Sequence, residues 1–385
     1  MKVLFFDLRR LYLDQKEQID RAVTGVLDSG WYILGNSCAK FEEEFAVSLG
    51  SGRTLGCNSG TDALILTMLA AGVTPDDEVI TVSHTAIPTI TAIVTLGAKP
   101  VFVEIDPETW LIDASKIQAA LTPKTRALLA VHLYGSMVDV PAIKKILLES
   151  GREDVSIIED VAQAHGATWI TSGISSQLSS GPESVQAGTQ ARFGAFSFYP
   201  TKNIGALGDA GAVFCRSETD LAQLKMLRNY GQKDRYNALV ARGINSRLDE
   251  VQAAVLSIKL PKLAEWNAKK SAQMTRYRTE LKGLPLQFQK VPKACVPAWH
   301  LCVVALENQH SRDRLVQYLA DHEIGTVIHY PHPTHLQPAF KGKEQVSLPV
   351  TESLASRIVS LPMNVGLTES EQSYVIDKLR AFWTQ

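Results

Sequence analysis

The chain has 385 residues, more than a single hydrophobic core usually holds, so two domains are expected. Hydrophobic residues make up 45% of the sequence and charged residues 21%, which is typical of a soluble globular protein. The 39 Lys and Arg residues and 40 Asp and Glu residues leave a net charge of -1, which excludes a global basic field for nucleic acid.

The cysteines and the first residues indicate a cytoplasmic protein. The 5 cysteines include no CxxC pair, which argues against a disulfide framework or a structural zinc site and favours a reducing compartment. Asp7, Arg9 and Arg10 directly follow a short apolar run, so no signal peptide is expected. Residues 79–98 carry no charge, but their threonines and Pro88 make them too polar to span a membrane.

Between about residues 55 and 216, short apolar runs alternate with helical patterns. The helical stretches 61–71 and 114–121 follow plausible caps at Ser59 or Gly60 and at Asp113. The strand-like runs are mostly apolar throughout, as expected for strands covered on both faces. They are residues 79–83, 100–105, 127–132, 156–158, 194–198 and 211–215. This alternation predicts an α/β domain with a mostly parallel sheet.

After residue 245 the pattern changes to that of a smaller α+β domain. Ser246 to Asp249 reads as a capping box for a helix that ends near Leu260, and Pro261 begins a long helical pattern. Mixed strand and helix patterns follow at 299–306, 312–322, 326–329 and 369–382, the last capped by Thr368 and Glu371. We expect a large domain at 1–250 and a small C-terminal domain at 251–385.

The segment Asn58-Ser-Gly-Thr61-Asp-Ala-Leu leads into an apolar helical pattern. The free backbone amides and the positive dipole end of a helix suit a phosphate, and the hydroxyls of Ser59 and Thr61 would add donors. An ordinary helix cap is the alternative interpretation.

Two further residues could serve a carbonyl cofactor. Asp160 ends a buried strand, where parallel sheets place ligand-binding groups, and it either caps the next helix or pairs with a protonated ring nitrogen. In SFYPTKNIGALG, Lys202 is either a surface lysine or a lysine bonded to such a cofactor. A phosphate cradle, a carboxylate and a lysine in this order are the parts that pyridoxal phosphate needs, and the freed lysine can act as general base.

Other cofactor motifs fit less well. The glycines at 50, 52 and 56 are spaced one residue too far for a dinucleotide fingerprint, and no GxxxxGK[ST] occurs. His329, His332 and His335 offer three imidazoles, but two prolines fix the backbone and no acidic or cysteine ligand is adjacent. A polar substrate loop is favoured there, a solvated loop is the alternative, and no metal site is predicted.

The sequence resembles the DegT/DnrJ/EryC1/StrS family of sugar aminotransferases over nearly its whole length. The matching stretches are NSGTDAL at 58–64, AVHLYG at 130–135, IEDVAQAHG at 158–166, FSFYPTKNIGALGD at 196–209, RNYG at 228–231, GINSRLDE at 243–250 and IHYP at 328–331. The resemblance implies the pyridoxal-phosphate-dependent fold type I, an aspartate aminotransferase-like α/β fold.

The resemblance also implies roles for individual residues. Lys202 would bond covalently to pyridoxal 5'-phosphate, Asp160 would contact its ring nitrogen, and Gln163 would lie against the ring or its hydroxyl. The phosphate would be held by Ser59, Gly60, Thr61 and Ser197. Asn245 would reach the coenzyme phosphate of a partner subunit, which implies a homodimer with shared active sites.

By the same resemblance, the expected substrates are a dTDP-linked keto-sugar and glutamate. The reaction would be amination of a dTDP-3-keto-6-deoxyhexose to the 3-amino-3,6-dideoxyhexose, in deoxysugar biosynthesis for lipopolysaccharide or another glycan. Candidate substrate-binding residues are His329, Tyr330 and His335. A nucleotide-sugar 4-aminotransferase is the nearest alternative, and a coenzyme-binding regulator without turnover is a more distant one.

Two features depart from the family. Ala86 stands where an aromatic residue usually stacks on the pyridine ring, and His84 could replace it if the segment is extended. The connection from Thr168 to Arg192 is longer than usual, and its Ser-, Gly- and Gln-rich part at 171–190 reads as a mobile surface loop. Arg247 is one possible partner for the carboxylates of glutamate.

Overall fold

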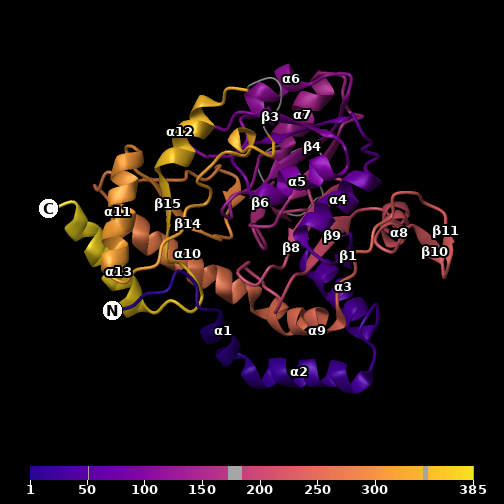
Figure 1. Cartoon of the computed structure of the whole chain (residues 1–385), viewed down its shortest axis with the longest axis horizontal. Coiled ribbons are helices and arrows are strands. Elements are labelled where there is room, and N and C mark those ends of the chain that lie inside the picture. The colour runs from indigo at the N-terminus through magenta and orange to yellow at the C-terminus, as the bar shows by residue number, and fades with distance from the viewer. Residues whose placement is uncertain (51, 172–183, 341–345, 385) are drawn as a thin grey trace.

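The computed structural model describes residues 1–50, 52–171, 184–340 and 346–384. A large α/β part and a smaller C-terminal α+β part lie side by side (Figure 1). Among the described residues, no helix has both the length and the apolar character that crossing a bilayer requires.

The central sheet has seven strands within the described residues, in the order β1-β9-β8-β5-β4-β2-β3. Neighbouring strands are parallel from β8 to β3, whereas β9 is antiparallel to both β8 and β1. The strands are β1 (Arg53–Cys57), β2 (Glu78–Val82), β3 (Lys99–Val103), β4 (Thr125–Val131), β5 (Ser156–Asp160), β8 (Phe193–Ser197) and β9 (Gly211–Cys215). The predicted mostly parallel sheet is confirmed. Strand β1, in which Gly56 packs against Leu248, was not predicted.

Both faces of this sheet are buried, which explains the continuous apolar runs of its strands. In β4, Ala127 and Leu129 belong to one hydrophobic core and Leu128 and Ala130 to another. The first core includes residues of α4, α5 and α8, and the second includes residues of α6 and α7. The helices therefore form layers on the two sides of the sheet.

Thirteen α-helices lie within the described residues. The first eight are α1 (Leu8–Asp14), α2 (Lys16–Ser29), α3 (Asn36–Ser48), α4 (Gly60–Ala70), α5 (Ile87–Thr95), α6 (Ile117–Ala120), α7 (Val140–Glu149) and α8 (Glu218–Leu227). The others are α9 (Glu250–Lys259), α10 (Leu263–Glu280), α11 (Gln309–Asp321), α12 (Pro349–Arg357) and α13 (Glu369–Phe382). Short 3-10 turns lie at η1 (Ala114–Lys116), η2 (Leu260–Lys262) and η3 (Thr334–Leu336).

The predicted helix ends agree with the structure in some places and fail in others. The side chains of Ser59 and Asp113 cap α4 and η1, and Thr368 with Glu371 forms the capping box of α13. The predicted helix at 114–121 is only the turn η1 followed by the one-turn α6. The predicted capping box at Ser246 is wrong, because the Ser246 hydroxyl bonds to the start of α4 instead.

The C-terminal part is built on an antiparallel sheet of β12 (Gln287–Phe288), β14 (Cys302–Ala305) and β15 (Ile358–Leu361). Helices α10, α11 and α13 contribute to its hydrophobic core. Of the segments predicted to mix strands and helices, 326–329 contributes only one bridge, between Val327 and Ser360. Val3 pairs with Ile324, so the chain begins in this part, where both ends are visible in Figure 1.

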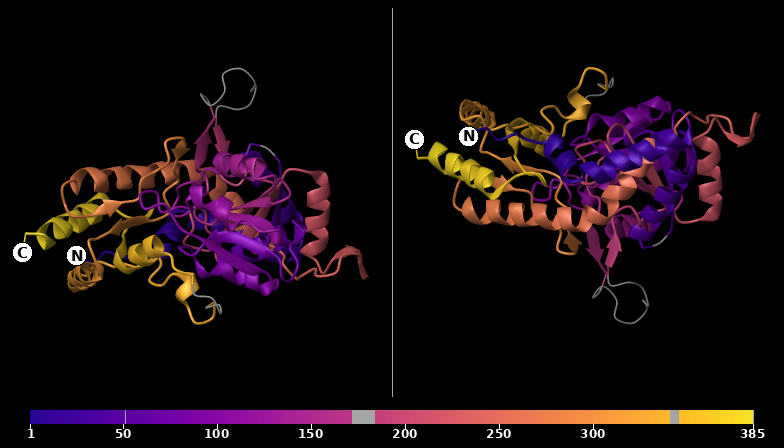
Figure 2. Two further views of the ribbon diagram at one scale, coloured as in Figure 1. Left: turned by 90° about the horizontal axis from the view of Figure 1, so that it is seen from above. Right: turned by 90° about the horizontal axis from the view of Figure 1, so that it is seen from below.

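Two small sheets complete the fold. The hairpin β10 (Gln232–Asp234) with β11 (Asn237–Ala238) projects from one end of the molecule (Figure 2). The other sheet joins β6 (Thr168–Ile170), β7 (Ser184–Gln186) and β13 (Cys295–Val296). The surface loop predicted at 171–190 is therefore wrong for its last residues, because 184–186 form β7 and Thr189 and Gln190 are buried. Residues 172–183 of that prediction lie outside the described residues.

Candidate active site

The register of the central sheet gathers several predicted site residues at one edge. Ser197, the last residue of β8, and Cys57, the last residue of β1, both pair with Gly211. Asp160, the last residue of β5, pairs with Ala195 of β8. Because β1, β5 and β8 run in the same direction, the segments that follow them start from the same edge of the sheet.

Gly60 and Ser197 meet at this edge. A Cβ atom on Gly60 would lie 2.5 Å from the Cβ of Ser197 and 3.0 Å from its hydroxyl oxygen, so only glycine fits there without displacing Ser197. Gly60 and Thr61 are the first residues of α4, whose first amides have no acceptor within the helix. Two backbone amides, the Thr61 hydroxyl and the Ser197 hydroxyl are a donor set that suits a phosphate.

The residues on either side of this donor set hold its backbone in place. The Ser59 hydroxyl accepts from the Asp62 amide at 3.1 Å, as an ordinary helix cap does. The Ser246 hydroxyl accepts from the Asn58 amide at 3.1 Å and donates to Asp62 at 2.8 Å. Asn245, next to Ser246, forms a backbone bridge with Asn229, and because the residue is exposed a ligand or a second chain can reach it.

Asp160 is a buried carboxyl group held in a fixed orientation. Its oxygens accept from the Thr89 hydroxyl at 2.9 Å and from the Ala162 amide at 3.2 Å. Burial raises the pKa of Asp160, although these two donors and nearby Lys202 oppose the change. A cationic ring nitrogen beside this carboxylate would favour its charged form. Thr89, which is part of α5, was not identified from the sequence.

Lys202 lies in the turn that follows β8, and its amide donates to the Tyr199 carbonyl at 2.8 Å. Burial lowers the pKa of Lys202 to about 8, and the charge of Asp160 partly offsets this effect. A lysine whose pKa lies near neutrality is partly uncharged, as a nucleophile toward an aldehyde must be. Together with the phosphate-type donor set and Asp160, Lys202 completes a set of groups that fits pyridoxal phosphate.

Gln163 links this edge to the C-terminal part. Its side-chain oxygen accepts from the Tyr134 amide at 2.9 Å, and its nitrogen donates to the Tyr330 hydroxyl at 2.8 Å. Burial raises the pKa of Tyr330, so its hydroxyl stays protonated. Tyr134, at φ 61, also bonds through its hydroxyl to His84 and to the His329 carbonyl. Tyr134 belongs to the matching stretch at 130–135, which could have identified it as a site residue.

The three predicted substrate-loop residues differ in their surroundings. Tyr330 reaches Gln163, as described above, and His329 Nδ1 is 2.8 Å from the Ser360 hydroxyl. Burial lowers the pKa of His329 to about 4, so its ring is neutral. His335 is buried, with its ring nitrogens 2.6 Å from the Ser83 hydroxyl and 3.2 Å from Glu352. These two contacts hold the His335 ring in place within its own loop. Tyr330, in contrast, contacts Gln163, which is a predicted cofactor residue.

Two other candidates also have defined partners. His84 is 1% exposed, and its ring lies edge-on to Tyr134 with centroids 5.8 Å apart. Ala86 is the N-cap residue of α5, so the extended segment ends there and does not continue in alternation. Arg247 bonds to the Asn229 side chain at 3.3 Å and lies over the Tyr230 ring.

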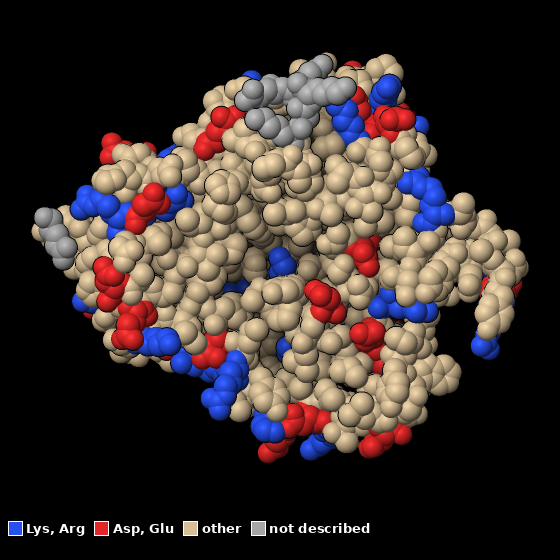
Figure 3. Space-filling model, in the orientation of Figure 1, with Lys and Arg blue, Asp and Glu red and all other residues tan. Residues whose placement is uncertain are grey.

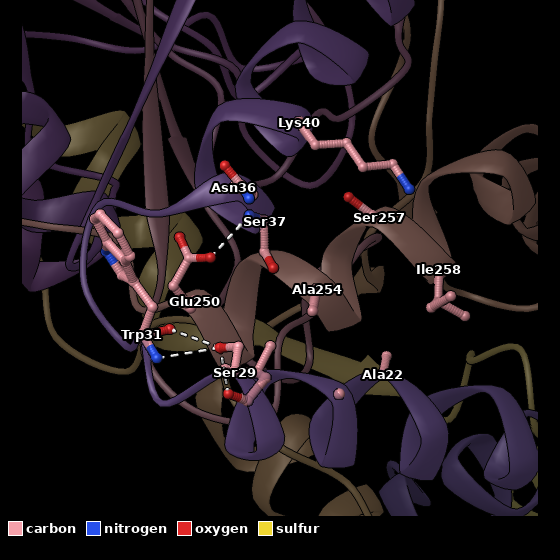
Figure 4. Close-up of a pocket in the computed structure, with 12 residues that line it drawn as sticks. Ala22, Ser29, Trp31, Asn36, Ser37, Lys40, Glu250, Ala254, Ser257 and Ile258 are labelled. Carbon is pink, nitrogen blue, oxygen red and sulfur yellow. Dashed lines mark hydrogen bonds between the residues drawn. The ribbon is translucent and has the colours of Figure 1, made fainter.

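The surface is hollowed near the middle of one face, with a lysine or arginine at the floor of the hollow (Figure 3). A separate pocket of about 520 Å³ lies where α2, α3 and α9 meet, and Trp31, Lys40 and Glu250 are among its lining residues (Figure 4). The Glu250 carboxylate accepts from the amides of Gly35 and Ser37. The predicted cofactor residues do not line this pocket, so it is distinct from the site at the sheet edge.

Comparisons with known proteins agree with this geometry. A model of the DegT/DnrJ/EryC1/StrS aminotransferase family matches residues 13–380. The chain is 42% identical to the erythromycin biosynthesis sensory transduction protein EryC1 of Saccharopolyspora erythraea, over 99% of this chain and 100% of that protein. It is 40% identical to dTDP-3-amino-3,4,6-trideoxy-alpha-D-glucose transaminase of Streptomyces venezuelae, over 98% and 96% of the two chains.

The crystal structure of S. venezuelae DesV in complex with a ketimine intermediate superposes with a TM-score of 0.92 at 39% identity, covering 100% of this chain and 99% of that chain. This likeness confirms the predicted fold class, and the family match confirms the resemblance found in the sequence. The chain therefore belongs to the DegT/DnrJ/EryC1/StrS aminotransferase family.

Proposed function

We propose that the protein transfers the amino group of glutamate to C3 of a dTDP-3-keto-6-deoxyhexose, with pyridoxal 5'-phosphate as coenzyme. The products are 2-oxoglutarate and the dTDP-linked 3-amino-3,6-dideoxyhexose. The observation that carries the proposal is the convergence of Lys202, Asp160 and the Gly60–Ser197 contact at one edge of the sheet. Family membership and the 3-amino sugar named for the Streptomyces relative support it.

Each residue of the site has a separate role in this reaction. Bound pyridoxal phosphate supplies an aldehyde that bonds amines and a protonated ring that stores electrons. Lys202 would hold the coenzyme covalently, and its Nζ, when it is free, would carry the proton to and from the reacting carbon. Asp160 keeps the ring nitrogen protonated, and Thr89 orients Asp160.

The remaining predicted residues hold and orient the ligands. The hydroxyls of Ser59, Thr61 and Ser197 and the start of α4 at Gly60 hold the coenzyme phosphate. Gln163 would lie against the coenzyme ring or its hydroxyl, and its side-chain nitrogen donates to the Tyr330 hydroxyl, which places Tyr330 next to the coenzyme site. His329 and Tyr330 contact the keto-sugar, and His335 supports their loop from Ser83.

We also infer a homodimer with shared active sites, in which Asn245 reaches the coenzyme phosphate of the partner subunit. The exposed Asn245 side chain and a run of exposed apolar residues at Trp31, Tyr32, Ile33 and Leu34 support this assembly. We assign residues 1–250 to a coenzyme domain and 251–385 to a small domain, against which the first residues of the chain pack through Val3. The cytoplasm is the proposed location, since the five cysteines are unpaired and buried.

The test uses the purified protein with coenzyme, glutamate and each dTDP-3-keto- or dTDP-4-keto-6-deoxyhexose. We expect 2-oxoglutarate and an amino sugar whose NMR spectrum places nitrogen at C3, and we expect borohydride to trap the coenzyme on Lys202. Lys202→Ala should lose the visible absorption band and turnover. Amination at C4 instead, or normal turnover by Lys202→Ala, would contradict the proposal.

A regulatory role without turnover is the second candidate, because one relative is named a sensory transduction protein. The same assay separates the two roles. A protein that binds the coenzyme through Lys202 but forms no 2-oxoglutarate with any of these sugars would favour regulation.

A further inference from the structure

A cavity of about 380 Å³ adjoins Lys202, bounded by α1, α10 and the turn that follows β8. Besides Lys202, it is lined by Lys259, Lys270 and the exposed Arg9. Among the described residues that line it, none is Asp or Glu. Four basic residues thus line one small space, and none of the described residues that line it carries a carboxylate.

Lys270 is the least usual of these residues. Its side chain is 4% exposed, and none of the described residues accepts a hydrogen bond or forms an ion pair with its ammonium group. Lys259, at 9% exposed, donates to the Gly205 carbonyl at 2.5 Å. Burial lowers the pKa of Lys270 to about 7 and that of Lys259 to about 8. An ammonium without a partner is costly to bury, and an anion in this cavity would give Lys270 one. The cavity is also lined by Asn203 and Asn364, whose buried side-chain oxygens have no hydrogen-bond partner among the described residues.

We propose that this cavity binds a carboxylate of the amino donor, with Lys270 and Lys259 as its ammonium partners. The proposal rests on the proposed aminotransferase function and names the dicarboxylate subsite of that reaction. The donor's amine must reach the group bonded to Lys202, and Lys202 lines the same cavity. A donor carboxylate bound at Lys270 would therefore lie in a cavity that also borders Lys202, the residue that the donor amine must displace.

The size and lining of the cavity favour the amino acid over the nucleotide sugar. Its volume lies at the small end of the roughly 300–1,000 Å³ range of small-molecule sites. Leu11 and Trp266 add apolar surface that suits the methylene groups of a dicarboxylate. A dTDP-hexose adds a nucleoside and two phosphates to a sugar ring, which is far more than this space encloses.

Stopped-flow measurement of the two half-reactions tests the assignment. Holoenzyme is mixed with glutamate, and separately the aminated enzyme is mixed with the dTDP-3-keto sugar. We expect Lys270→Met to lower the second-order rate constant for glutamate roughly ten- to a hundredfold, as loss of a hydrogen-bonded charge pair does. The sugar half-reaction should keep its rate, and the neighbouring exposed Lys269→Met should leave both half-reactions unchanged.

Glutarate, a dicarboxylate without an amine, gives a binding readout that does not depend on turnover. Calorimetry should show that wild-type holoenzyme binds glutarate, and that Lys270→Met and Lys259→Met each weaken this binding about tenfold or more. Equal glutarate affinities for all three proteins would overturn the assignment. A defect confined to the sugar half-reaction would also overturn it, because the cations would then serve the diphosphate. If wild type fails to aminate any sugar, the proposed function fails, while glutarate binding still decides the role of the cavity.

Discussion

Replacing Lys270 by methionine should stabilise the fold, because methionine fills a similar volume without a buried charge. Burial lowers the pKa of Lys270 from its ordinary value of 10.5 to about 7. Each pH unit by which a pKa falls corresponds to about 1.4 kcal/mol. Holding Lys270 in its charged form therefore costs the folded state about 5 kcal/mol at low pH, before any gain from a bound anion.

The pH dependence of this cost has a definite sign. Between pH 7 and 10.5 the lysine is charged in the unfolded chain and neutral in the folded protein, so the unfolded chain binds one more proton. Wild-type stability therefore rises with pH through this window, and the cost is fully present only below about pH 7. Between pH 7 and 9 the advantage of Lys270→Met should shrink by about 2 kcal/mol, because the folded-state lysine is already half deprotonated at pH 7.

Urea denaturation at fixed protein and coenzyme concentrations measures this difference. Wild type, Lys270→Met and the exposed-site control Lys269→Met are compared at pH 7, 8 and 9. The control should track wild type at every pH, since its side chain is solvated in both states. If the stability difference between Lys270→Met and wild type does not change with pH, then burial does not lower the pKa of Lys270. His165 and His300, whose pKa values Lys270 helps to lower, provide a second readout by NMR titration.

Three further substitutions test the rest of the structure. Gly60→Ala should weaken coenzyme binding in a fluorescence titration, because the new Cβ would lie 2.5 Å from the Cβ of Ser197. The control Gly25→Ala should leave coenzyme affinity unchanged, because its new Cβ would have no atom within 4 Å. Asp160→Asn should lower kcat on the order of 10²–10³-fold while the coenzyme remains bound, and equal kcat values would refute the electrostatic role of Asp160. Glu250→Gln should lower the free energy of unfolding by about 1–3 kcal/mol near pH 7. Burial raises the pKa of Glu250, but amide donors such as Gly35 and Ser37 outweigh burial and lower it. The loss of stability should therefore fade as the pH falls and Glu250 becomes protonated. A urea-denaturation difference for Glu250→Gln that grew toward low pH would contradict this account.

Much of the fold and site could be predicted because the signals are local. Strands buried on both faces read as apolar runs, and Asp160 and Ser197 each end such a run. The rule that ligands gather at the carboxyl ends of parallel strands then brings them together without knowledge of the register. Lys202 follows β8 by only a few residues, so its place near this edge also follows from the sequence.

Other features depend on partners that are distant in the sequence. The direction of β9 is set by its pairing with β1 and β8, and β1 itself is stabilised by packing of Gly56 against Leu248. Ser246 has the spacing of a helix cap, yet its hydroxyl bonds to Asp62, which precedes it by 184 residues. Local spacing cannot distinguish these alternatives, because the competing partner is supplied by the tertiary fold.

Lys270 illustrates both what the sequence determines and what only the tertiary structure decides. The helical spacing of Trp266 and Met274 places Lys270 on the buried stripe of α10 and its neighbour Lys269 outside that stripe. The sequence thus determines which lysine turns inward. Only the tertiary structure decides that it meets a cavity beside Lys202, because that cavity forms where α1, α10 and the turn after β8 come together.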